Sequence, residues 1–292
     1  IHKAAQGIMF VSDNTLSSAK KYFSDRLDAV FSPTELKSMW TQIICKRMHW
    51  TSTDLMLKQG ERLSESDLLY VRSFVKGLLN SVPFQYLIGE TDFYGLTISC
   101  DSRALIPRPE TEELVAWIVE LETQPKRMLD CCTGSGCIAL ALKSVYNESI
   151  VQALDFSHEA LMLSAENAKK LDLNIDLIQE DVLNFSAEFL AETSDFDVIV
   201  SNPPYIETDD PHLARLQHEP LAALVSGQDG LEAIRTIIEQ AKHHLVQGGW
   251  LLIEHGWQQA PQVRALLEAA GYQQVQSKLD LAGIERCSGG QK

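Results

Sequence analysis

Hydrophobic residues in the first part of the chain recur at the spacing of α-helices. A serine, a proline and a glutamate at 32–35 have the arrangement of a capping box, and the apolar residues after it return every three or four positions: Leu36, Met39, Trp40, Ile43 and Ile44. A second start signal at 64–67 precedes a similar stripe: Leu68, Val71, Val75 and Leu78. Because each apolar stripe must pack against another element, residues 1–82 are predicted to form a small helical bundle.

The pattern then changes from helical spacing to short alternating runs. Apolar and polar residues alternate around Phe93 and Ile98, on either side of Gly95, which indicates a β-hairpin. Two prolines, at 107 and 109, then prevent regular strand pairing. Residues 83–109 are therefore predicted to be a β-hairpin connector, and a helix is predicted to follow at about 110–121.

Further along, apolar runs alternate with helical patterns. The runs are interpreted as strands at 127–131, 150–156, 175–179, 196–201, 250–254 and 274–278. This alternation is typical of an α/β domain with a largely parallel sheet, so residues 110–292 are predicted to form such a domain. Ligands bind to these sheets beyond the carboxyl ends of the strands, and the residues that follow each run are therefore candidates for a site.

Composition narrows the classes of function. The chain has 292 residues, with 40 acidic and 25 basic side chains and a formal charge of −15. Binding to nucleic acid needs clustered Lys and Arg, so a broad nucleic-acid surface is not expected. No apolar stretch reaches the ~18 residues that would span a bilayer, so no membrane partner is expected. The acidic excess is interpreted as favouring solubility, with attraction of a basic protein partner as the alternative.

The cysteines indicate a reducing compartment and no metal site. Three of the six cluster in one turn, at 131, 132 and 137, which is not the pattern of a disulfide framework, and a cytoplasmic protein is predicted. A zinc site needs about four ligands at suitable spacing. No second Cys or His pair accompanies Cys131 and Cys132, so no metal is expected.

A glycine-rich turn follows the first predicted strand of the α/β domain. The sequence from Asp130 through Cys131, Cys132, Thr133, Gly134 and Ser135 to Gly136 ends the strand and opens a helix. Glycines allow close approach of a ligand to the backbone, and the start of a helix offers unpaired N–H groups. Asp155 ends the next strand about 20 residues later, where an acidic residue can accept hydrogen bonds from both hydroxyls of a ribose. Its alternative role is that of an N-cap beside Ser157.

Two cofactors are compatible with such a unit, a dinucleotide and S-adenosylmethionine. The dinucleotide fingerprint requires a third glycine, but Ile138 and Ala139 stand in this part of the motif. Asp130 favours S-adenosylmethionine, because a carboxylate before the turn can face the cationic methionine moiety. Asp181, after the third strand, is a candidate for a contact on the adenine side, with a plain loop acid as the alternative. S-adenosylmethionine is therefore the predicted cofactor.

The sequence Asn-Pro-Pro-Tyr at 202–205 follows directly on an apolar strand. Consecutive prolines fix φ and form a stiff loop at the end of the sheet where ligands bind. A carboxamide nitrogen is a poor nucleophile, and the Asn202 side-chain oxygen and the Pro203 carbonyl can accept both of its protons and orient it. Tyr205 is predicted to pack against the planar amide or the cationic methyl group. The alternative is a structural turn of two prolines.

Together these motifs resemble class I methyltransferases that modify planar amino groups. Further segments are similar to the release factor glutamine methyltransferase family, also called PrmC or HemK: residues 84–89, 106–112, 218–220 with Leu224, and 252–256. The resemblance covers residues 83 to about 289. It implies a Rossmann-like seven-stranded methyltransferase domain, a hairpin link, and an N-terminal helical domain whose proposed role is substrate docking.

The resemblance also implies an activity and a set of site residues. The activity is transfer of a methyl group from S-adenosylmethionine to N5 of the glutamine in the Gly-Gly-Gln motif of class 1 peptide chain release factors. The implied cofactor residues are Cys132, Thr133, Gly134, Ser135, Gly136, Asp155, Val182 and Asn202. The implied substrate residues are Asn202, Pro203, Pro204 and Tyr205. Of these, Asn202, Pro203 and Tyr205 are predicted to be catalytic.

Two features depart from or add to the family pattern. The family usually has glycine where Cys132 stands, and because cysteine is restricted to ordinary backbone angles, the turn is expected to differ slightly. The chain also ends in Gly289, Gly290, Gln291 and Lys292, the first three of which are the tripeptide of the proposed substrate. Coincidence is one interpretation of this ending, and methylation of one copy by another is the second.

Three other functions are compatible with parts of the sequence. A DNA or RNA amino-methyltransferase shares the Asn-Pro-Pro-Tyr motif, but it is expected to have a basic region for the target and to flip its base. A methyltransferase for a ribosomal-protein glutamine is the alternative function nearest to the proposed one, and residues 108–111 and 254–256 favour the release-factor branch over it. A binding module with a degenerate cofactor site is the third, against which Asp155 and the intact segment 202–205 argue.

Overall fold

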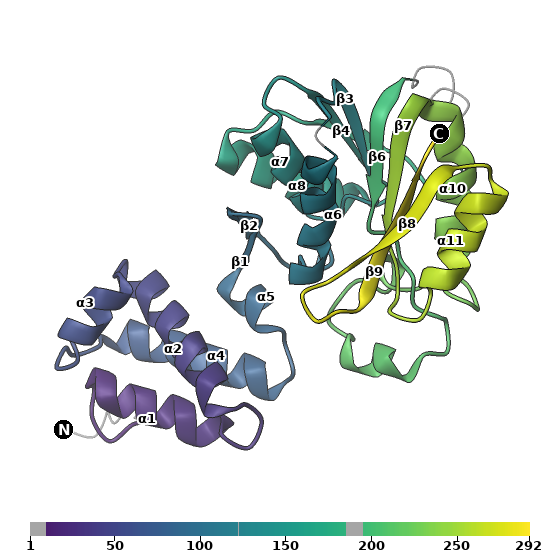
Figure 1. Ribbon diagram of the computed structural model, residues 1–292. Helices are drawn as coiled ribbons and strands as arrows, with labels where there is room; N and C mark the ends of the chain where they lie inside the picture. Colours follow the sequence, from purple (N-terminus) through teal and green to yellow (C-terminus); the bar gives the residue numbers. More distant parts are fainter. Residues whose placement is uncertain (1–9, 122, 185–194) are drawn as a thin grey trace, which may run out of the picture. The chain divides into compact units, whose positions relative to one another are not determined.

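The computed structural model describes residues 10–121, 123–184 and 195–292, in two compact units that divide between Ile88 and Gly89 (Figure 1). The first unit is helical. Its helices are α1 (Leu16–Leu27), α2 (Pro33–Met48), α3 (Ser52–Leu57), α4 (Glu65–Leu79) and α5 (Phe84–Ile88). In the ranges described, none of the helices is both long enough and apolar enough to cross a membrane.

The predicted helix starts of the first unit are confirmed. Ser32 accepts a hydrogen bond from the backbone N–H of Glu35, whose carboxylate accepts one from the N–H of Ser32 at 2.8 Å. Ser64 and Asp67 make the same reciprocal pair at the start of α4. These bonds satisfy backbone N–H groups that have no partner within the helix.

The apolar stripes of these helices form the core of the first unit. The predicted positions on α2 and α4 are buried, apart from Met39, which is partly buried at the edge of the cluster. Phe23 of α1 packs against Trp40 of α2 with ring centroids 5.7 Å apart. The predicted helical bundle is therefore confirmed, and its core is separate from that of the second unit.

A two-stranded hairpin opens the second unit. Strands β1 (Glu90–Phe93) and β2 (Leu96–Ser99) pair antiparallel, as predicted, around a turn in which Tyr94 and Gly95 both have positive φ, of 47° and 78°. Phe93 is fully buried in the same apolar cluster as helix α6 (Glu112–Glu120), which ties the hairpin to the second unit. The short helix α5 precedes the hairpin and was not predicted.

The second unit is built on a seven-stranded sheet in the order β5-β4-β3-β6-β7-β9-β8, which confirms the expected fold. The strands are β3 (Arg127–Cys131), β4 (Ile150–Asp155), β5 (Asp176–Gln179), β6 (Phe196–Ser201), β7 (Leu245–Glu254), β8 (Gln273–Leu279) and β9 (Glu285–Gln291). Strands β5, β4, β3, β6 and β7 are parallel, and β9 runs antiparallel to β7 and β8. The pattern of apolar residues did not predict β9.

Helices cover both faces of this sheet (Figure 1). One face carries α6 (Glu112–Glu120), α7 (Cys137–Val145) and α8 (His158–Leu171), and the other carries α10 (Glu232–His244) and α11 (Ala260–Ala269). Successive residues of a strand point to opposite faces, so Met128 packs with the first group of helices and Leu129 with the second. Both faces are buried, which explains the nearly continuous apolar runs of the central strands.

Two glycines in β9 are required by packing. A Cβ on Gly289 would lie 2.6 Å from the carbonyl oxygen of Leu251, and a Cβ on Gly290 would lie 2.8 Å from the Cβ of Tyr272. Both glycines are buried, between β7 and β8. Their position inside the sheet accounts for the Gly-Gly-Gln ending as an element of the fold.

Gly289→Ala is expected to lower the free energy of unfolding by about 2 kcal/mol, because the added methyl group meets backbone rather than a flexible side chain. Denaturant titration followed by circular dichroism measures this change. Gly60→Ala is the matched control, since nothing lies within 4 Å of a Cβ at that position. Equal stability of the two variants would contradict the packing argument.

Candidate active site

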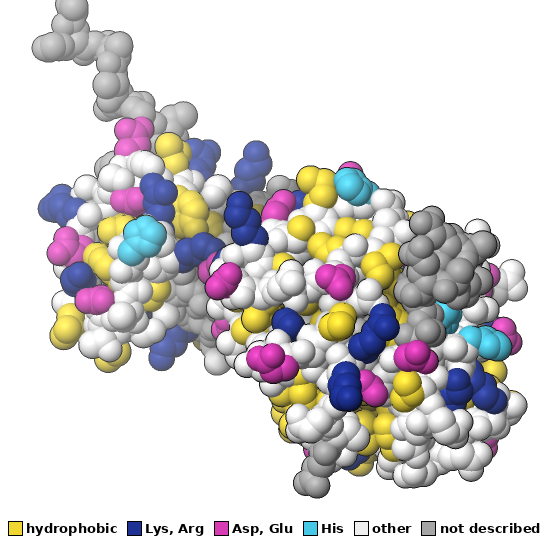
Figure 2. Space-filling view, turned by 90° about the horizontal axis from the view of Figure 1, so that it is seen from above, with side chains coloured by type: hydrophobic (Ala, Val, Ile, Leu, Met, Phe, Trp, Pro, Cys, Tyr) yellow, Lys and Arg dark blue, Asp and Glu magenta, His cyan; other side chains and the backbone are white. Residues whose placement is uncertain are grey.

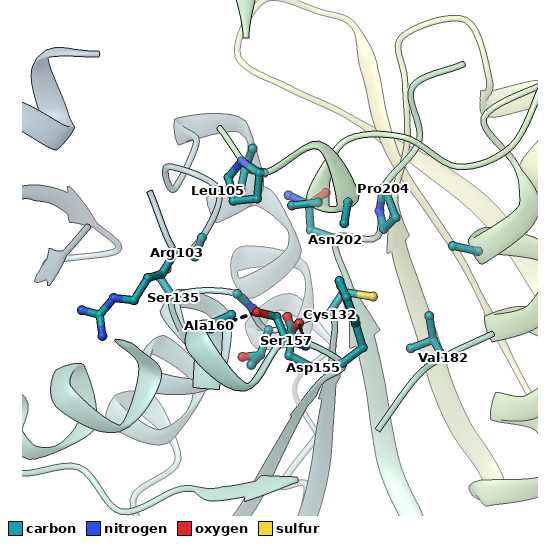
Figure 3. Close-up of a pocket in the computed structure, with 18 of the residues that line it drawn as sticks. Arg103, Leu105, Cys132, Ser135, Asp155, Ser157, Ala160, Val182, Asn202 and Pro204 are labelled. Atoms are coloured by element: carbon teal, nitrogen blue, oxygen red, sulfur yellow. Dashed lines mark hydrogen bonds between the residues drawn. The ribbon is translucent and has the colours of Figure 1, made fainter. Parts of the chain in front are cut away.

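A cavity of about 480 Å³ lies in the second unit, beyond the carboxyl ends of β3, β4 and β6 (Figure 3). Its walls come from the loops that follow these strands and from two further segments, 102–108 and 220–226. The predicted site residues that line it are Cys132, Thr133, Gly134, Ser135, Asp155, Asp181, Val182, Asn202 and Pro204. Asp130, Gly136, Pro203 and Tyr205 are not among the lining residues.

Asp130 lies beneath the glycine-rich turn rather than in the cavity wall. It is fully buried and accepts hydrogen bonds from the Thr133 hydroxyl at 2.6 Å and the Ala139 backbone N–H at 3.2 Å. Burial raises the pKa of Asp130 to about 7. The carboxyl group therefore ties the turn to the first turn of α7. The predicted direct contact with a methionine moiety is not supported by this position.

The turn itself has the geometry of a ligand cradle. Gly134 and Gly136 have φ values of 56° and 83°, which side chains rarely adopt, and a Cβ on Gly136 would lie 2.8 Å from the Ser164 hydroxyl oxygen. Helix α7 starts at Gly136 without a side-chain cap. Ser135 lines the cavity, and its hydroxyl oxygen is buried with the Cys137 thiol as its neighbour. Polar groups of the turn thus remain available to a ligand.

Cys132 takes a left-handed backbone conformation with φ of 61°. The expectation that cysteine would keep to ordinary angles and change the turn is therefore wrong. Bonds on both sides hold the backbone: Ser201 donates to the Cys131 carbonyl at 2.7 Å, and the Thr133 N–H donates to the Leu154 carbonyl at 2.9 Å. These hydrogen bonds hold the backbone of residue 132 in the left-handed conformation that glycine adopts easily. With a cysteine there, the conformation costs strain energy.

Cys132→Gly is expected to raise the free energy of unfolding by about 0.5–1 kcal/mol, which is the left-handed penalty less the greater chain entropy of glycine. Thermal and denaturant unfolding measure this gain. Cys132→Ala removes the sulfur but keeps the Cβ, so it separates strain from side-chain chemistry. A gain of the same size in the alanine variant would show that backbone strain is not the cause.

Asp155 holds two loops and lines the cavity at the same time. One carboxylate oxygen accepts the Gly134 N–H at 2.9 Å, and the other accepts the Ser157 N–H, also at 2.9 Å. Ser157 is itself the N-cap of α8, so Asp155 supports the helix start without being its cap. Burial raises the pKa of Asp155. Each carboxylate oxygen can accept a second hydrogen bond, which leaves capacity for ligand hydroxyls.

The third predicted strand contributes Asp181 and Val182 to the cavity. Asp181 is exposed, and its carboxylate already accepts the Leu183 N–H at 2.9 Å. Val182 is buried and presents an apolar surface. Val182 thus gives this side of the cavity an apolar wall, with the Asp181 carboxylate at its edge. Figure 3 shows the position of Val182.

The Asn-Pro-Pro-Tyr segment places an unpaired acceptor at the cavity. The Asn202 side-chain nitrogen Nδ2 donates to the Thr111 hydroxyl oxygen at 3.2 Å. The side-chain oxygen Oδ1 of Asn202 is buried and has no partner among the described residues. Figure 3 shows Asn202 and Pro204 together on one side of the cavity, with Asp155 on another. A buried acceptor without a partner is costly, so it indicates a ligand N–H.

Tyr205 lies behind the cavity rather than in it. Its ring packs against the second apolar core, and its hydroxyl donates to the Glu254 carboxylate at 3.3 Å. Burial raises the pKa of the Tyr205 hydroxyl. Pro203 is also buried. The geometry therefore gives Tyr205 a supporting position, and the predicted packing against a substrate amide is not supported by it.

Residue-by-residue reasoning missed the segments that close the cavity. Arg108 forms an ion pair with Glu219, whose other carboxylate oxygen accepts the Ile106 N–H at 3.0 Å. In the sequence, residues 106–112 and 218–220 stand out only because they resemble the family. Nothing in the local pattern signals that residues 113 positions apart are neighbours. In the described ranges, no group of three or more His, Cys, Asp or Glu is arranged to hold a metal ion.

Comparisons with known proteins identify a family. Residues 111–278 match the family model described as "Methyltransferase small domain", and residues 19–89 match "PrmC N-terminal domain". The release factor glutamine methyltransferase of Coxiella burnetii is 36% identical over 93% of this chain and 97% of its own length. That of Escherichia coli is 42% identical over 70% of this chain and 73% of its own.

A solved structure shows the same fold. A methyltransferase from Pyrococcus furiosus superposes with a TM-score of 0.52 at 17% identity, over 74% of this chain and 98% of the other. Two family models and two relatives of more than 30% identity thus point to one family. The chain belongs to the release factor glutamine methyltransferase family and is a methyltransferase.

Proposed function

We propose that this chain transfers a methyl group from S-adenosylmethionine to N5 of the glutamine in the Gly-Gly-Gln motif of class 1 peptide chain release factors. The observation that carries the proposal is the buried, unpaired Oδ1 of Asn202 at the cavity. It is an acceptor without a donor, and a primary carboxamide supplies such a donor. The two relatives are named as release factor glutamine methyltransferases, which supports the choice of glutamine and of release factors.

The cavity fits the cofactor in size and in chemistry. A volume of about 480 Å³ is within the range of small-molecule and cofactor sites. Asp155 would accept the ribose hydroxyls, and the uncapped start of α7 with Ser135 would hold the polar amino-acid end. Val182 would contact the adenine. When bound, S-adenosylmethionine supplies an electrophilic methyl group on a sulfonium.

The residues of the chain act on the nucleophile by orienting it. Asn202 Oδ1 and the Pro203 carbonyl would each accept one proton of the glutamine –NH₂, which fixes the plane of the amide and the direction of its nitrogen. The stiff diproline backbone keeps these two acceptors in place. Good alignment supplies up to roughly 7–11 kcal/mol of barrier lowering. The nitrogen would form a bond to the methyl carbon as the carbon–sulfur bond of the donor breaks and leaves a neutral thioether. The nitrogen would then release one proton to solvent, and because that proton has become acidic, no strong base is needed.

Two further parts of the proposal concern the partner and the compartment. The N-terminal helical unit is proposed to dock the release factor, since it matches a domain model of the same family. A cytoplasmic location follows from a release-factor substrate. Direct binding of nucleic acid is not proposed. On the face shown in Figure 2, Lys and Arg side chains are interspersed with Asp and Glu.

One experiment tests the proposed function. The full chain, labelled S-adenosylmethionine and a purified class 1 release factor are incubated, with a Gln→Ala variant of the release factor's tripeptide as the control. Label is expected in the intact release factor alone. Duplex DNA, RNA and ribosomal proteins serve as competing acceptors. Preferential labelling of any of these, or equal labelling of the Gln→Ala control, would overturn the proposal.

A further inference from the structure

We propose that Thr111 and Glu254 are positioning residues that orient the Asn202 carboxamide so that Oδ1, and not Nδ2, faces the substrate. This inference rests on the proposed function, because it concerns how Asn202 presents its acceptor. The two ends of an asparagine side chain are nearly the same in shape but opposite in hydrogen bonding. With Nδ2 toward the cavity, a substrate –NH₂ would face another –NH₂.

Thr111 selects one end of the amide. It lies in the short 3-10 turn η1 (Pro109–Thr111) just before α6, and it is 2% exposed. Its hydroxyl oxygen is 3.2 Å from Asn202 Nδ2. A hydroxyl can either accept from Nδ2 or, with the amide rotated, donate to Oδ1. The hydrogen bond therefore selects an orientation only if something else takes the hydroxyl proton.

Glu254, the last residue of β7, is the group that takes that proton. Its side chain is buried, and the Thr111 hydroxyl stabilises the charged form of its carboxyl. Oε1 accepts from the Tyr205 hydroxyl at 3.3 Å. Oε2 is buried with no assigned hydrogen bond among the described residues, so it has room for the neighbouring Thr111 proton. An ionised carboxylate is an acceptor only.

The donors then all run in one direction. Asn202 donates to Thr111, and Tyr205 donates to Glu254 from the other side; in this proposal the Thr111 hydroxyl donates to Glu254 Oε2, which has no other partner among the described residues. With Glu254 Oε2 taken by the Thr111 hydroxyl, the acceptor in this chain of bonds that is left for the substrate is Asn202 Oδ1. Three segments far apart in sequence, around residues 111, 202 and 254, thus share one task, and Tyr205 takes a role in support of the site.

The ionisation of Glu254 controls this direction. Burial raises the pKa of Glu254 to about 7. Glu110 raises this pKa further, and the Arg286 guanidinium lowers it. Tyr205, Cys137 and Cys287 are the other titratable groups near the carboxyl, and burial keeps all three neutral by raising their pKa values. Below its pKa, Glu254 carries a proton of its own, Thr111 can donate to Asn202, and the selection is lost. Activity is therefore expected to rise with pH through this range.

Thr111→Val, which keeps the shape but removes the hydroxyl, is expected to lower kcat about 10- to 30-fold. The dissociation constant for S-adenosylmethionine should stay within about twofold, because the lost bond does not hold the cofactor. Thr111→Ser should restore kcat to within about threefold of wild type. The matched control is Ser149→Ala, which removes a buried hydroxyl that donates to the Pro125 carbonyl away from the cavity. It should leave kcat unchanged.

Two further measurements distinguish positioning from a structural role. In Glu254→Gln the rise of kcat with pH near 7 should disappear, whereas a purely structural carboxyl would leave the shape of the profile unchanged. Nitrogen-15 spectra assign the Asn202 side-chain amide by its absence in Asn202→Ala. In Thr111→Val this amide should exchange with water at least tenfold faster than in wild type.

The outcomes separate the two proposals. If wild type fails to methylate a release-factor glutamine, the proposed function fails, and the amide spectrum still decides whether Thr111 orients Asn202. If wild type is active but Thr111→Val retains the wild-type kcat, or the amide exchanges at the wild-type rate, the orienting role is overturned. Failure of Thr111→Ser to restore kcat would also count against it, since the serine hydroxyl can make the same bonds.

Discussion

Asn202→Ala is expected to lower kcat about 100- to 1000-fold while the dissociation constant for S-adenosylmethionine stays within about threefold. The magnitude is that of removing one preorganised polar group from a site where it acts on the reacting atoms. The Asn202 Oδ1 is buried, unpaired and held just after β6, so its loss removes one of the two acceptors proposed for the amide. The contacts proposed for the cofactor come mainly from the loops after β3 and β4, so a small effect on its binding is expected.

Single-turnover rates with excess enzyme measure the chemical step, and calorimetry measures cofactor binding. Pro204→Ala is the control, because it changes the same loop without removing an acceptor from the amide, and it should cost less than Asn202→Ala. An Asn202→Ala enzyme with near wild-type turnover would refute the amide-holding role. A large loss of cofactor affinity with kcat retained would instead place Asn202 in the cofactor site alone.

Asp155→Ala is expected to raise the dissociation constant for S-adenosylmethionine about 100-fold, equivalent to about 3 kcal/mol. The carboxylate is proposed to accept two ribose hydroxyls, and hydrogen bonds to charged groups contribute about 1.5–3 kcal/mol each. The same carboxylate also holds the backbone N–H groups of Gly134 and Ser157, so its loss loosens both loops. At saturating cofactor, kcat should fall no more than about fivefold.

Calorimetric titration with S-adenosylmethionine and with its demethylated product checks this expectation. Asp181→Ala is the matched control: Asp181 also lines the cavity, but it is exposed, and its loss should change affinity no more than about threefold. Equal effects of the two substitutions would show that the cavity responds to total negative charge rather than to the particular contacts of Asp155.

The two expected effects fall on different parts of one cavity. In the proposed function, Asp155 and the glycine-rich turn hold the cofactor, and Asn202, supported by Thr111 and Glu254, holds the substrate. Variants in the first group should therefore change binding of the cofactor, and variants in the second should change turnover. A variant that changed both equally would indicate disturbance of the fold instead.

Much of the fold was predictable because its causes are local. Helix starts such as Ser32 and Ser64 follow from side chains that cap backbone N–H groups three residues away. The central strands follow from apolar runs that must be buried on both faces. The exception is β9, which has few apolar side chains and whose Gly289 is explained only by the approach of β7. Its pairing with β7 and β8 is non-local, and no short pattern records it.

The candidate site divides in the same way. Sequence spacing placed Asp155 and Asn202 at the cavity, because parallel strands bring their carboxyl ends to one edge of the sheet. Two residues of the predicted site motifs do not line the cavity. Asp130 lies below the glycine-rich turn, and Tyr205 lies behind the cavity. Which side of a strand end faces a ligand depends on the packing of the helices, and the motif does not contain that information.

By itself, then, the sequence determined most of the element types, the edge of the sheet at which the cavity lies, and the presence of Asn202 and Pro204 there, since each depends on residues close together in the chain. Only the tertiary structure decided that Cys132 keeps a left-handed backbone, that Arg108 meets Glu219, and that Thr111 and Glu254 stand behind Asn202. The reason is physical: strain at one residue and hydrogen bonds over more than 90 positions are imposed by the packing of the whole sheet.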